Sequence, residues 1–562
     1  MLINDVNLKL KFSLGLFLGS LVITNLTGCG SHTSKTEPLV KPMPLFDDLG
    51  THHYPVSTSV PDAQRYFDQG LILAFGFNHS EAARSFREAY RLDPDCALCY
   101  WGEALVLGPN INAPMDPSVV PQAYKSMRES QALAKNATDK EQALISALAK
   151  RYSKTAPVNR RPLDEAYAAA MRDVARRFPG DSVIAALFAE SLMDLHPWNF
   201  WTKQGKAQPW TAEIVATLER ALELDANNPL ANHLYIHALE ASPHAAKAIP
   251  SAQRLPSLVP GSGHLVHMPA HIYIRVGRYR DAILANQRAV RIDQGYLSHA
   301  HAESIYTIAY VPHNYHFLWA AAIKTGQKQL ASKAAADTAA QVKPELMREP
   351  GFSGTLQHFY TIPLYTKALF GEWDAILTES APPADLLYPA GVWHYARGLA
   401  LLRKGKPDES ARELEKLDKI AKDPAIAKLA IFDLNPVTQI LQIAGEILRG
   451  ELAAQNKDYD QAIFHLQRAV ELEDGLNYTE PKDWYLPPRQ VLGAILLEAG
   501  QAGKAEQAYR QDLVYHPQNG WSLFGLVLSL REQGKNREAD SVNLQFGEVW
   551  ADADVTLTGS RF

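Results

Sequence analysis

The sequence predicts an all-α fold, a solenoid in which successive helical hairpins stack on one another. Small residues recur 34 residues apart, for example from Gly500 to Gly534 and from Ala505 to Ala539. Strand-like alternation of apolar and polar residues is scarce. Apolar residues make up 46% of the 562 residues and charged residues 21%, which is ordinary for a globular chain and excludes wholesale disorder.

The first residues are typical of a secretory signal. Lys9 and Lys11 precede an apolar run over residues 12–23, which is too short to span a bilayer. The sequence Leu-Thr-Gly-Cys that ends at Cys29 resembles a bacterial lipobox. We therefore expect residues 1–28 to be a lipoprotein signal peptide and Cys29 to carry lipid, including palmitate, that anchors the chain to a membrane. The alternative is a plain signal peptide with an incidental cysteine.

The residues after the lipobox predict where the chain resides. Gly30 follows Cys29, instead of the aspartate that favours retention in the inner membrane, so we expect attachment to the outer membrane. Residues 29–48 are polar and contain proline, as a tether does. The body of the protein is then expected in the periplasm.

The first repeat, residues 63–96, shows the pattern of a tetratricopeptide unit, in which two antiparallel helices pack closely. Small residues allow close approach, large residues fill the space between helices, and a proline starts the next turn. The matching residues are Tyr66, Gly70, Ala82, Phe86, Ala89 and Pro94. This predicts a tetratricopeptide-type superhelix, by default a binding scaffold.

The same frame returns at intervals further along the chain, and we assign residues 49–345 and 346–562 to an amino-terminal and a carboxy-terminal array. An insertion of 15 residues precedes the frame at 312–345. The predicted frames are 97–130, 195–228, 229–262, 263–296, 312–345, 356–389, 391–424, 443–476, 486–519 and 520–553.

Ten of the 19 histidines lie in one window, from His233 to His316. Several recur with the period of the repeat. His233 to His267 and His237 to His271 are both 34 residues, and His264 to His313 is 49, which is 34 plus the 15-residue insertion. Steps of three and four place these side chains on one stripe of the first helix of each hairpin.

This register predicts a ligand-binding stripe on the concave face of the superhelix, called here the histidine groove. Its residues are His233, His237, His264, His267, His271, Arg275, His313 and His316. Arg275 lies four residues beyond His271 and suits an acidic ligand.

Three interpretations of the groove remain open. The seven histidines bind a transition metal such as zinc, copper or iron, with Glu240, Glu303 or Met268 as further ligands, because imidazoles four residues apart on a helix form a metal clip. Alternatively, they bind an organic or peptide ligand. In the third interpretation they are structural core histidines, although seven polar rings in register exceed what a core requires.

Cys96 and Cys99 form a CxxC sequence at the start of a helix. We favour a local disulfide or buried thiols over a redox or metal site, because no second CxxC lies at zinc-ribbon spacing and no histidine follows as in haem attachment.

The net charge of −5 argues against nucleic-acid binding, which needs a basic face. The G-x-S-x-G and Walker sequences of common hydrolases and nucleotidases are missing, so enzymatic activity stays open.

The stretch from Asn232 to Tyr279, NHLYIHALEASPHAAKAIPSAQRLPSLVPGSGHLVHMPAHIYIRVGRY, resembles a group of bacterial tetratricopeptide lipoproteins and secreted proteins. The segments DPDCALCYWGEAL, PWNFWTKQGKAQP, VPHNYHFL and NGWSLFGL fit the same group. Its members are commonly labelled as components of a TonB-linked uptake system. The resemblance implies a membrane-anchored periplasmic scaffold with a protein or peptide partner, and the alternative is a metal-binding protein or metal-dependent enzyme that uses the same histidines.

Overall fold

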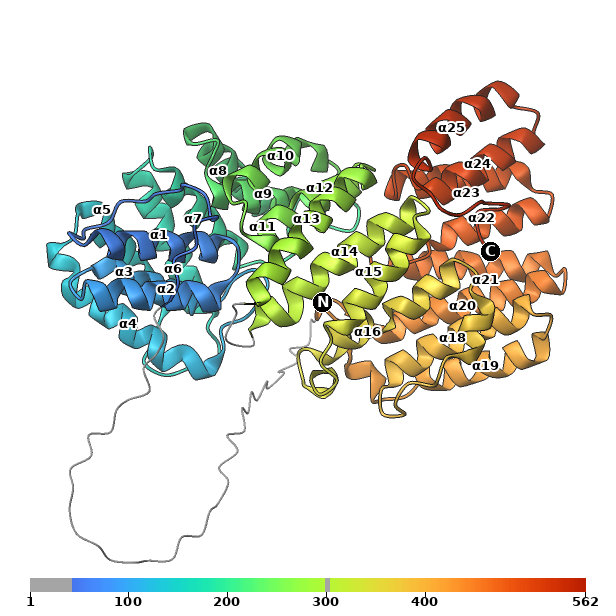
Figure 1. The fold of residues 1–562 in the computed structure, drawn as a ribbon, viewed down its shortest axis with the longest axis horizontal. Helices are drawn as coiled ribbons and strands as arrows, with labels where there is room; N and C mark the ends of the chain where they lie inside the picture. Colours follow the sequence, from blue (N-terminus) through green and yellow to red (C-terminus); the bar gives the residue numbers. More distant parts are fainter. Residues whose placement is uncertain (1–42, 299–303) are drawn as a thin grey trace, which may run out of the picture. The chain divides into compact units, whose positions relative to one another are not determined.

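The computed structural model describes residues 43–298 and 304–562, so the predicted signal peptide and Cys29 lie outside the described residues. Nearly every described element is a helix, which confirms the predicted all-α fold (Figure 1). Two short strands, β1 (Ala430–Ile431) and β2 (Asn435–Pro436), pair antiparallel. In the described part of the chain, no helix combines the length and the apolar character needed to cross a membrane.

The described residues form two compact units. The first unit contains residues 43–47, 52–74 and 78–198. The second contains residues 48–51, 75–77 and 199–562, and holds all the predicted histidine-groove residues.

The first unit contains most of α1 and six further helices, joined in places by single 3-10 turns. The helices are α1 (Pro61–Phe75), α2 (His79–Leu92), α3 (Ala97–Val106), α4 (Val120–Leu133), α5 (Asp139–Leu148), α6 (Arg161–Arg177) and α7 (Ser182–Met193). The turns are η1 (Pro117–Val119), η2 (Ala134–Asn136) and η3 (Ala149–Arg151). The α1 and α2 helices form the first predicted repeat, in which the Phe86 ring is fully buried.

The second unit continues the series of helices. Its first part contains α8 (Thr211–Leu224), α9 (Pro229–Glu240), η4 (Ala245–Ala248), α10 (Ile249–Leu258), α11 (Gly263–His267), α12 (Pro269–Arg275), α13 (Tyr279–Leu297), η5 (Tyr306–Tyr310), α14 (Val311–Lys324) and α15 (Lys328–Ala340). The rest contains η6 (Leu346–Arg348), α16 (Ser353–Leu369), α17 (Trp373–Thr378), α18 (Leu387–Arg403), α19 (Pro407–Ala421), η7 (Ile426–Lys428), α20 (Val437–Gln455), α21 (Tyr459–Asp474), α22 (Pro488–Glu498), α23 (Ala502–Tyr515), α24 (Gly520–Glu532) and α25 (Asn536–Val549).

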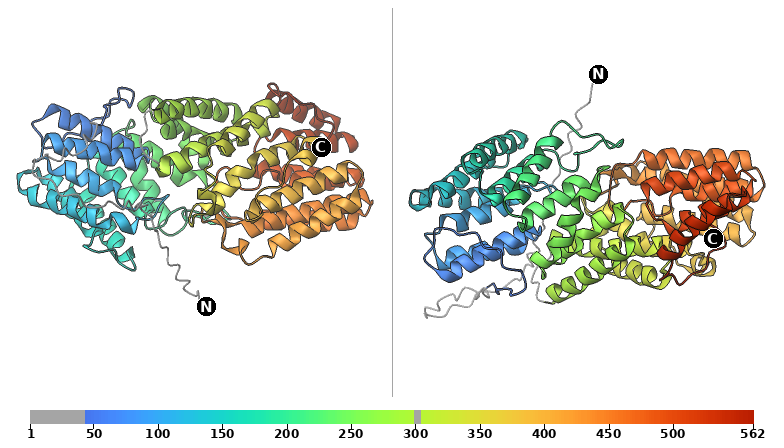
Figure 2. Two further views of the ribbon diagram at one scale, coloured as in Figure 1. Left: turned by 60° about the horizontal axis from the view of Figure 1, so that its bottom comes forward. Right: turned by 90° about the horizontal axis from the view of Figure 1, so that it is seen from above.

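Most predicted frames correspond to one helical hairpin of the second unit. The two helices of each such hairpin pack side by side, as Figures 1 and 2 show. The pairs are α14 and α15, α18 and α19, α20 and α21, α22 and α23, and α24 and α25. In the frame at 263–296, α11 and α12 together take the place of the first helix, and α13 is the second.

The frame at 195–228 is the clearest departure from the predicted pattern, because only its second helix, α8, is present. Gly205 has a positive φ of 73° and Pro209 lacks a backbone donor, so both disfavour a helix there. Trp201 donates its indole N–H to the backbone oxygen of Ala238 at 2.7 Å, which holds the segment as a loop against α9.

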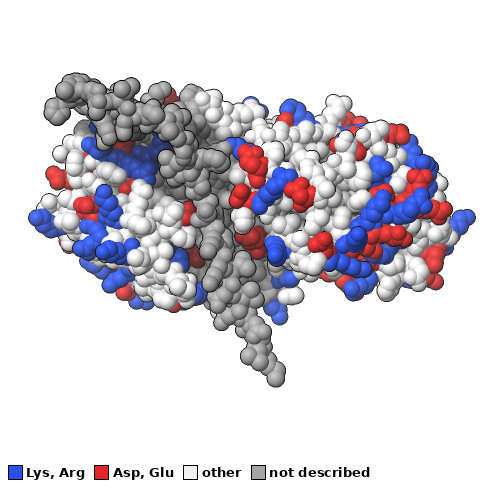
Figure 3. All heavy atoms as spheres, turned by 90° about the horizontal axis from the view of Figure 1, so that it is seen from below, with Lys and Arg blue, Asp and Glu red and all other residues white. Residues whose placement is uncertain are grey.

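Residue 345, where the sequence suggests that one array ends, lies inside the second unit. Helix α15 packs against α16 across this position, so the stacking continues through it. Acidic and basic side chains lie interspersed over the right-hand part of the face shown in Figure 3, as on an ordinary solvated surface.

Candidate metal centre

Six of the seven predicted groove histidines form two clusters of three. His233, His237 and His264 are the first triad, and His267, His271 and His313 are the second triad. In each triad, one nitrogen of every ring lies within 4.8 Å of the other two. We call the two triads together the six-histidine centre.

Helix α9 carries two histidines of the first triad. The Asn228 side chain accepts a hydrogen bond from the backbone N–H of Ala231 at 2.9 Å and so caps the helix, and Pro229 occupies the first helical position. Every residue of α9 is buried. His233 and His237 are four residues apart, so both rings emerge on one side of this buried helix.

Two histidines of the second triad lie on two short helices, α11 and α12, that follow each other with nearly continuous helical geometry. Ser262 caps the start of α11, and Pro269 begins α12 because it lacks the N–H that an unbroken helix would use. Met268 keeps helical φ and ψ angles of −49° and −35° between them. His267 and His271 therefore still project from one face, although they belong to different helices.

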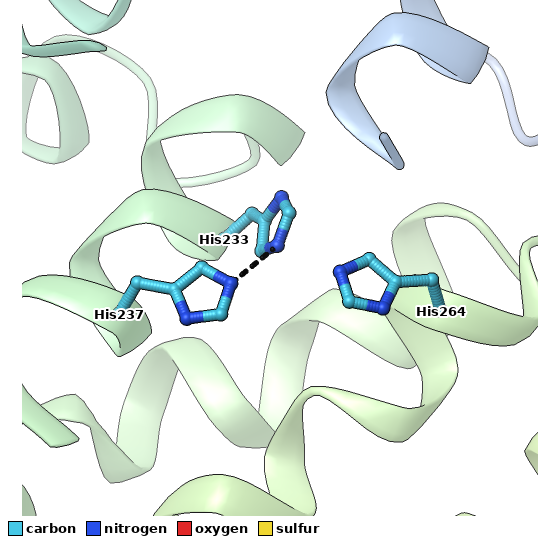
Figure 4. A group of neighbouring side chains, drawn as sticks. All are labelled: His233, His237 and His264. Carbon is cyan, nitrogen blue, oxygen red and sulfur yellow. Dashed lines mark hydrogen bonds between the residues drawn. The ribbon is translucent and has the colours of Figure 1, made fainter. Parts of the chain in front are cut away.

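In the first triad, the rings of α9 face that of His264 on α11 (Figure 4). The Nε2 atoms of His233 and His237 lie 3.0 Å apart. Nδ1 of His233 lies 2.7 Å from the backbone oxygen of Phe75, and Nδ1 of His237 lies 2.6 Å from Oε1 of Glu240. Neither nitrogen of His264 has a hydrogen-bond partner among the described residues.

The second triad repeats this arrangement. The Nε2 atoms of His267 and His271 also lie 3.0 Å apart. Nδ1 of His267 lies 2.7 Å from Oδ1 of Asn286, and Nδ1 of His271 lies 2.6 Å from Oε2 of Glu240. The third member, His313, comes from α14, and its Nδ1 has no partner in the described chain.

These contacts determine which nitrogen carries the proton. A backbone carbonyl and a carboxylate only accept hydrogen bonds, and Asn286 also presents its oxygen, because its Nδ2 donates to Ala282. Each Nδ1 must therefore carry a hydrogen, which in a neutral ring leaves Nε2 with a bare lone pair. Two lone pairs 3.0 Å apart repel each other unless a cation lies between them. Both pairs of Nε2 atoms are thus arranged to bind a cation.

Glu240 connects the two triads. Its two oxygens accept from His237 of the first triad and His271 of the second, and Oε2 also accepts from the Tyr478 hydroxyl at 3.0 Å. Arg275 donates through Nε to the backbone oxygen of Glu240 at 2.8 Å. Since the Glu240 oxygens contact Nδ1 atoms, the carboxylate orients the imidazoles and does not itself face the Nε2 atoms.

The charge states follow from burial and these bonds. Burial and the neighbouring imidazoles lower the pKa values of His233, His264, His267 and His313 well below 6.5, so these rings are neutral at pH 7. Burial alone would raise the pKa of Glu240, but its interactions with His271 and His237 outweigh burial and hold that pKa below the ordinary value. Glu240 therefore supplies a negative charge beside the imidazoles of both triads.

The rings are buried, whereas the sequence predicts that they line an open groove. At most 3% of each of His233, His237, His264, His267 and His271 is exposed. Phe77 packs against the first triad, with ring centroids 4.5 Å from His233, and Phe317 packs against the second, 4.5 Å from His267. These aromatic rings cover histidine side chains that would be exposed if they lay on the open concave face of a superhelix.

His316 lies apart from both triads. Its ring packs against Trp319 and His358 at centroid distances of 5.2 and 5.4 Å, and neither of its nitrogens has a partner in the described chain. It shares α14 with His313, but a step of three residues turns it toward α16.

Cys96 and Cys99 are joined by a disulfide at the start of α3. Both sulfur-bearing residues are fully buried, and both belong to the first unit, away from the histidines in sequence.

Two residues that contact the centre, Phe75 and Tyr478, are not predicted by any pattern in the sequence. Phe75 and Tyr478 are 158 and 238 residues from their partners His233 and Glu240. Glu240 itself lies three residues after His237, so the helical spacing did suggest it, although as a metal ligand.

Comparison with known proteins gives no family and only distant structural similarities. No family model and no curated protein matches the sequence. Among solved structures, human IFIT1 dimer with m7Gppp-AAAA is similar over 88% of this chain and 92% of its own, with 14% identity and a TM-score of 0.31. Yeast Tom70 is similar over 85% and 90%, with 12% identity and a TM-score of 0.27. The TPR domain of P58(IPK) is similar over 85% and 99%, with 12% identity and a TM-score of 0.22.

Proposed function

We propose that this chain is a transition-metal-binding protein that holds one ion in each triad. The observation that carries the proposal is the pair of Nε2 atoms 3.0 Å apart in each triad, with the Nδ1 atoms of both rings held by acceptors. Hydrogen bonds from Nδ1 to carboxylates and carbonyls are the usual supports of histidine metal ligands. A third imidazole in each triad completes a three-nitrogen set.

Among zinc, copper and iron, the donor set favours copper. Six imidazoles and no carboxylate oxygen face the two ion positions, and imidazole is a ligand that suits copper. Glu240 is the single ionised group that touches both triads within the described chain. Two monovalent copper ions would be balanced by this carboxylate better than two divalent ions, because uncompensated charge is expensive in a buried site.

Three protein ligands per ion leave a coordination position open. Such an ion binds small molecules from outside, so the same centre serves a carrier or an enzyme.

The decisive experiment measures metal content. Untagged protein from metal-replete growth is expected to retain about two equivalents of one transition metal after gel filtration, one for each triad. His267→Ala should lose at least one equivalent, because it removes a ligand of the second triad. His465→Ala is the control, since Nδ1 of His465 is likewise held by a side-chain oxygen, that of Glu446 at 2.7 Å, but the ring lies outside the centre.

Two results would contradict the proposal. The first is less than about a tenth of an equivalent of any transition metal in folded protein, because a multi-histidine site should bind tightly. The second is an equal loss of metal in the two variants.

We also propose that the chain is an outer-membrane lipoprotein whose superhelix binds a protein or peptide partner in the periplasm, alongside TonB-dependent uptake. The tetratricopeptide fold and exposed apolar side chains such as Phe464 and Leu544, 54% and 72% exposed, support a partner surface. Incorporation of labelled palmitate, lost in Cys29→Ser, tests the anchor. Crosslinking in cells followed by pull-down tests the partner, and a failure to recover any TonB-dependent transporter would contradict the link to uptake.

A further inference from the structure

The second unit contains a pocket that is connected to Glu240 through two of the residues that line it. Arg275, Tyr478 and Glu480 line it, and the first two of these also bond Glu240. The pocket has a mouth open to solvent and about 50 Å³ of space for the centres of water-sized molecules, which is room for a few waters or for one small planar molecule. Nothing in the proposed metal binding uses this space.

Three cations line the pocket: Arg275, Lys324 and Lys482. None of them forms an ion pair with a carboxylate in the described part of the chain. Burial lowers the pKa of Lys324 to about 8. Asp512 attracts Lys324 from a distance, but its oxygens accept hydrogen bonds from His516, Asn519 and Ser522.

The single carboxyl group in the lining does not neutralise these cations. Glu480 lies 2.5 Å from the Tyr478 hydroxyl, and burial raises the pKa of Glu480 to about 7. Even when Glu480 is ionised, one carboxylate faces three cations, so the lining of the pocket carries a net positive charge.

Much of the rest of the wall is aromatic, and contacts outside the pocket hold several of these rings in place. Trp319 donates its indole N–H to Thr366 at 2.7 Å, and Tyr485 stacks on Tyr365 with centroids 4.5 Å apart. Trp484 is only 2% exposed, yet its indole N–H has no partner among the described residues. An unpaired buried donor is unfavourable, so a ligand that accepts a hydrogen bond from the Trp484 indole would be favoured. The flat aromatic surfaces beside this donor suit a planar ring.

We propose that this pocket binds a small aromatic carboxylate. Its acidic group would pair with Lys324 and Lys482, and its ring would pack against Trp319 and Trp484. A carboxylate satisfies the unpaired cations, and a planar ring matches walls of tryptophan and tyrosine. The proposal does not depend on the metal centre, because none of these four residues contacts a triad.

The test uses the full chain stripped of metal with a chelator, and benzoate as the probe. Calorimetric titration should show saturable binding of one benzoate per chain. Benzamide, which has the same shape without the charge, and acetate, which has the charge without the ring, should each bind at least about tenfold more weakly. Inorganic phosphate should also bind more weakly, because it has no ring.

The double variant Lys324→Met/Lys482→Met should weaken benzoate binding at least about tenfold, since it removes both pairing cations. Lys428→Met, at an exposed position on η7, should leave it unchanged. Circular dichroism and metal content of each variant report whether the fold and the six-histidine centre are intact.

The proposal is overturned if benzoate does not saturate by about 10 mM, the affinity of a weak specific ligand. It is equally overturned if benzamide or phosphate binds as well as benzoate, or if the folded double variant binds benzoate like the wild type. Because the titration is done without metal, a failure to bind benzoate would not contradict the metal proposal. Equally, a protein that binds no metal would not contradict the proposed carboxylate pocket.

Discussion

At the scale of single residues, Glu240 links the chemistry of both triads. One carboxylate accepts the Nδ1 protons of His237 and His271, so both Nε2 lone pairs are directed into the centre. The same oxygen that accepts from His271 accepts from Tyr478 as well. Three donors to one buried carboxylate keep it ionised, which adds the negative charge that a bound cation needs.

Glu240→Gln should lower the affinity of the protein for its metal by about 10- to 100-fold, because a glutamine is neutral and its amide nitrogen cannot accept an Nδ1 proton. Competition against a chelator of known affinity measures the change. Glu446→Gln breaks a similar bond to His465, outside the centre, and should have no effect on affinity. Equal affinities of the wild type and Glu240→Gln would contradict the supporting role of Glu240.

Another buried histidine should make the stability of the protein depend on pH. Burial lowers the pKa of His358 to about 3, whereas a histidine in an unfolded chain titrates near 6.5. Below pH 6.5 the His358 side chain therefore binds a proton in the unfolded chain but not in the folded protein. For this reason His358 lowers the stability of the wild type as the pH falls.

His358→Gln should be less stable than the wild type at pH 7, because it disrupts the contact between Nδ1 and the Tyr388 hydroxyl at 2.9 Å. That difference should shrink by about 2 kcal/mol between pH 7 and pH 5, as the wild type alone loses the contribution of the titrating ring. Urea denaturation of both proteins at each pH gives the difference and cancels all other groups. A difference that is constant with pH would show that His358 titrates normally.

At the scale of elements, the stacking of helices depends on a large ring held between two glycines. Phe86 of α2 lies between Gly70 of α1 and Gly102 of α3, where an added Cβ would come within 2.8 and 2.4 Å of the ring. Tyr509 of α23 lies in the same way between Gly493 and Gly525, at 2.5 and 2.2 Å. In both cases the ring is 16 residues from each glycine, so the same packing occurs in the first unit and in the second.

Gly525→Ala should destabilise the protein by about 1–3 kcal/mol, although alanine is the better helix former. The Tyr509 ring cannot move aside, because Gly493 lies close to it on the other side and its hydroxyl bonds Ser560 at 2.7 Å. Thermal unfolding measures the loss. Gly547→Ala in α25, where a Cβ meets nothing within 4 Å, is the control and should be neutral or slightly stabilising. A stabilised Gly525→Ala protein would disprove the close packing.

At the scale of the whole molecule, the six-histidine centre ties together helices that are distant in sequence. Its ligands come from α9, α11, α12 and α14, all in the second unit. A bound ion therefore stabilises that unit by its binding free energy, about 2.7 kcal/mol when the free metal is at 100 times the dissociation constant.

Metal should slow hydrogen exchange in peptides of the second unit, above all in α9 to α14, and leave those of the first unit unchanged. Mass spectrometry of the chelator-treated and the metal-loaded protein compares the two units within one sample. Equal protection of both units would place the metal elsewhere or indicate non-specific binding.

Much of the architecture was predictable because it depends on local spacing. The hairpin frames at 443–476 and 520–553 agree with the helix pairs α20–α21 and α24–α25. The frame at 195–228 failed because repeat spacing alone does not register that Gly205 and Pro209 interrupt a helix. The clustering of six histidines followed from their register, whereas the turn of His316 toward His358 did not, because it depends on the neighbour that α16 supplies.

The sequence by itself determined the helical hairpins and which histidines can share a face, because both depend on how residues are spaced along one helix. Only the tertiary structure decided that the triads are buried under Phe77 and Phe317, and that Tyr478 reaches Glu240 across 238 residues. Those contacts arise from the path of the chain through space, and periodicity in a sequence carries no information about which distant segment returns to cover a site.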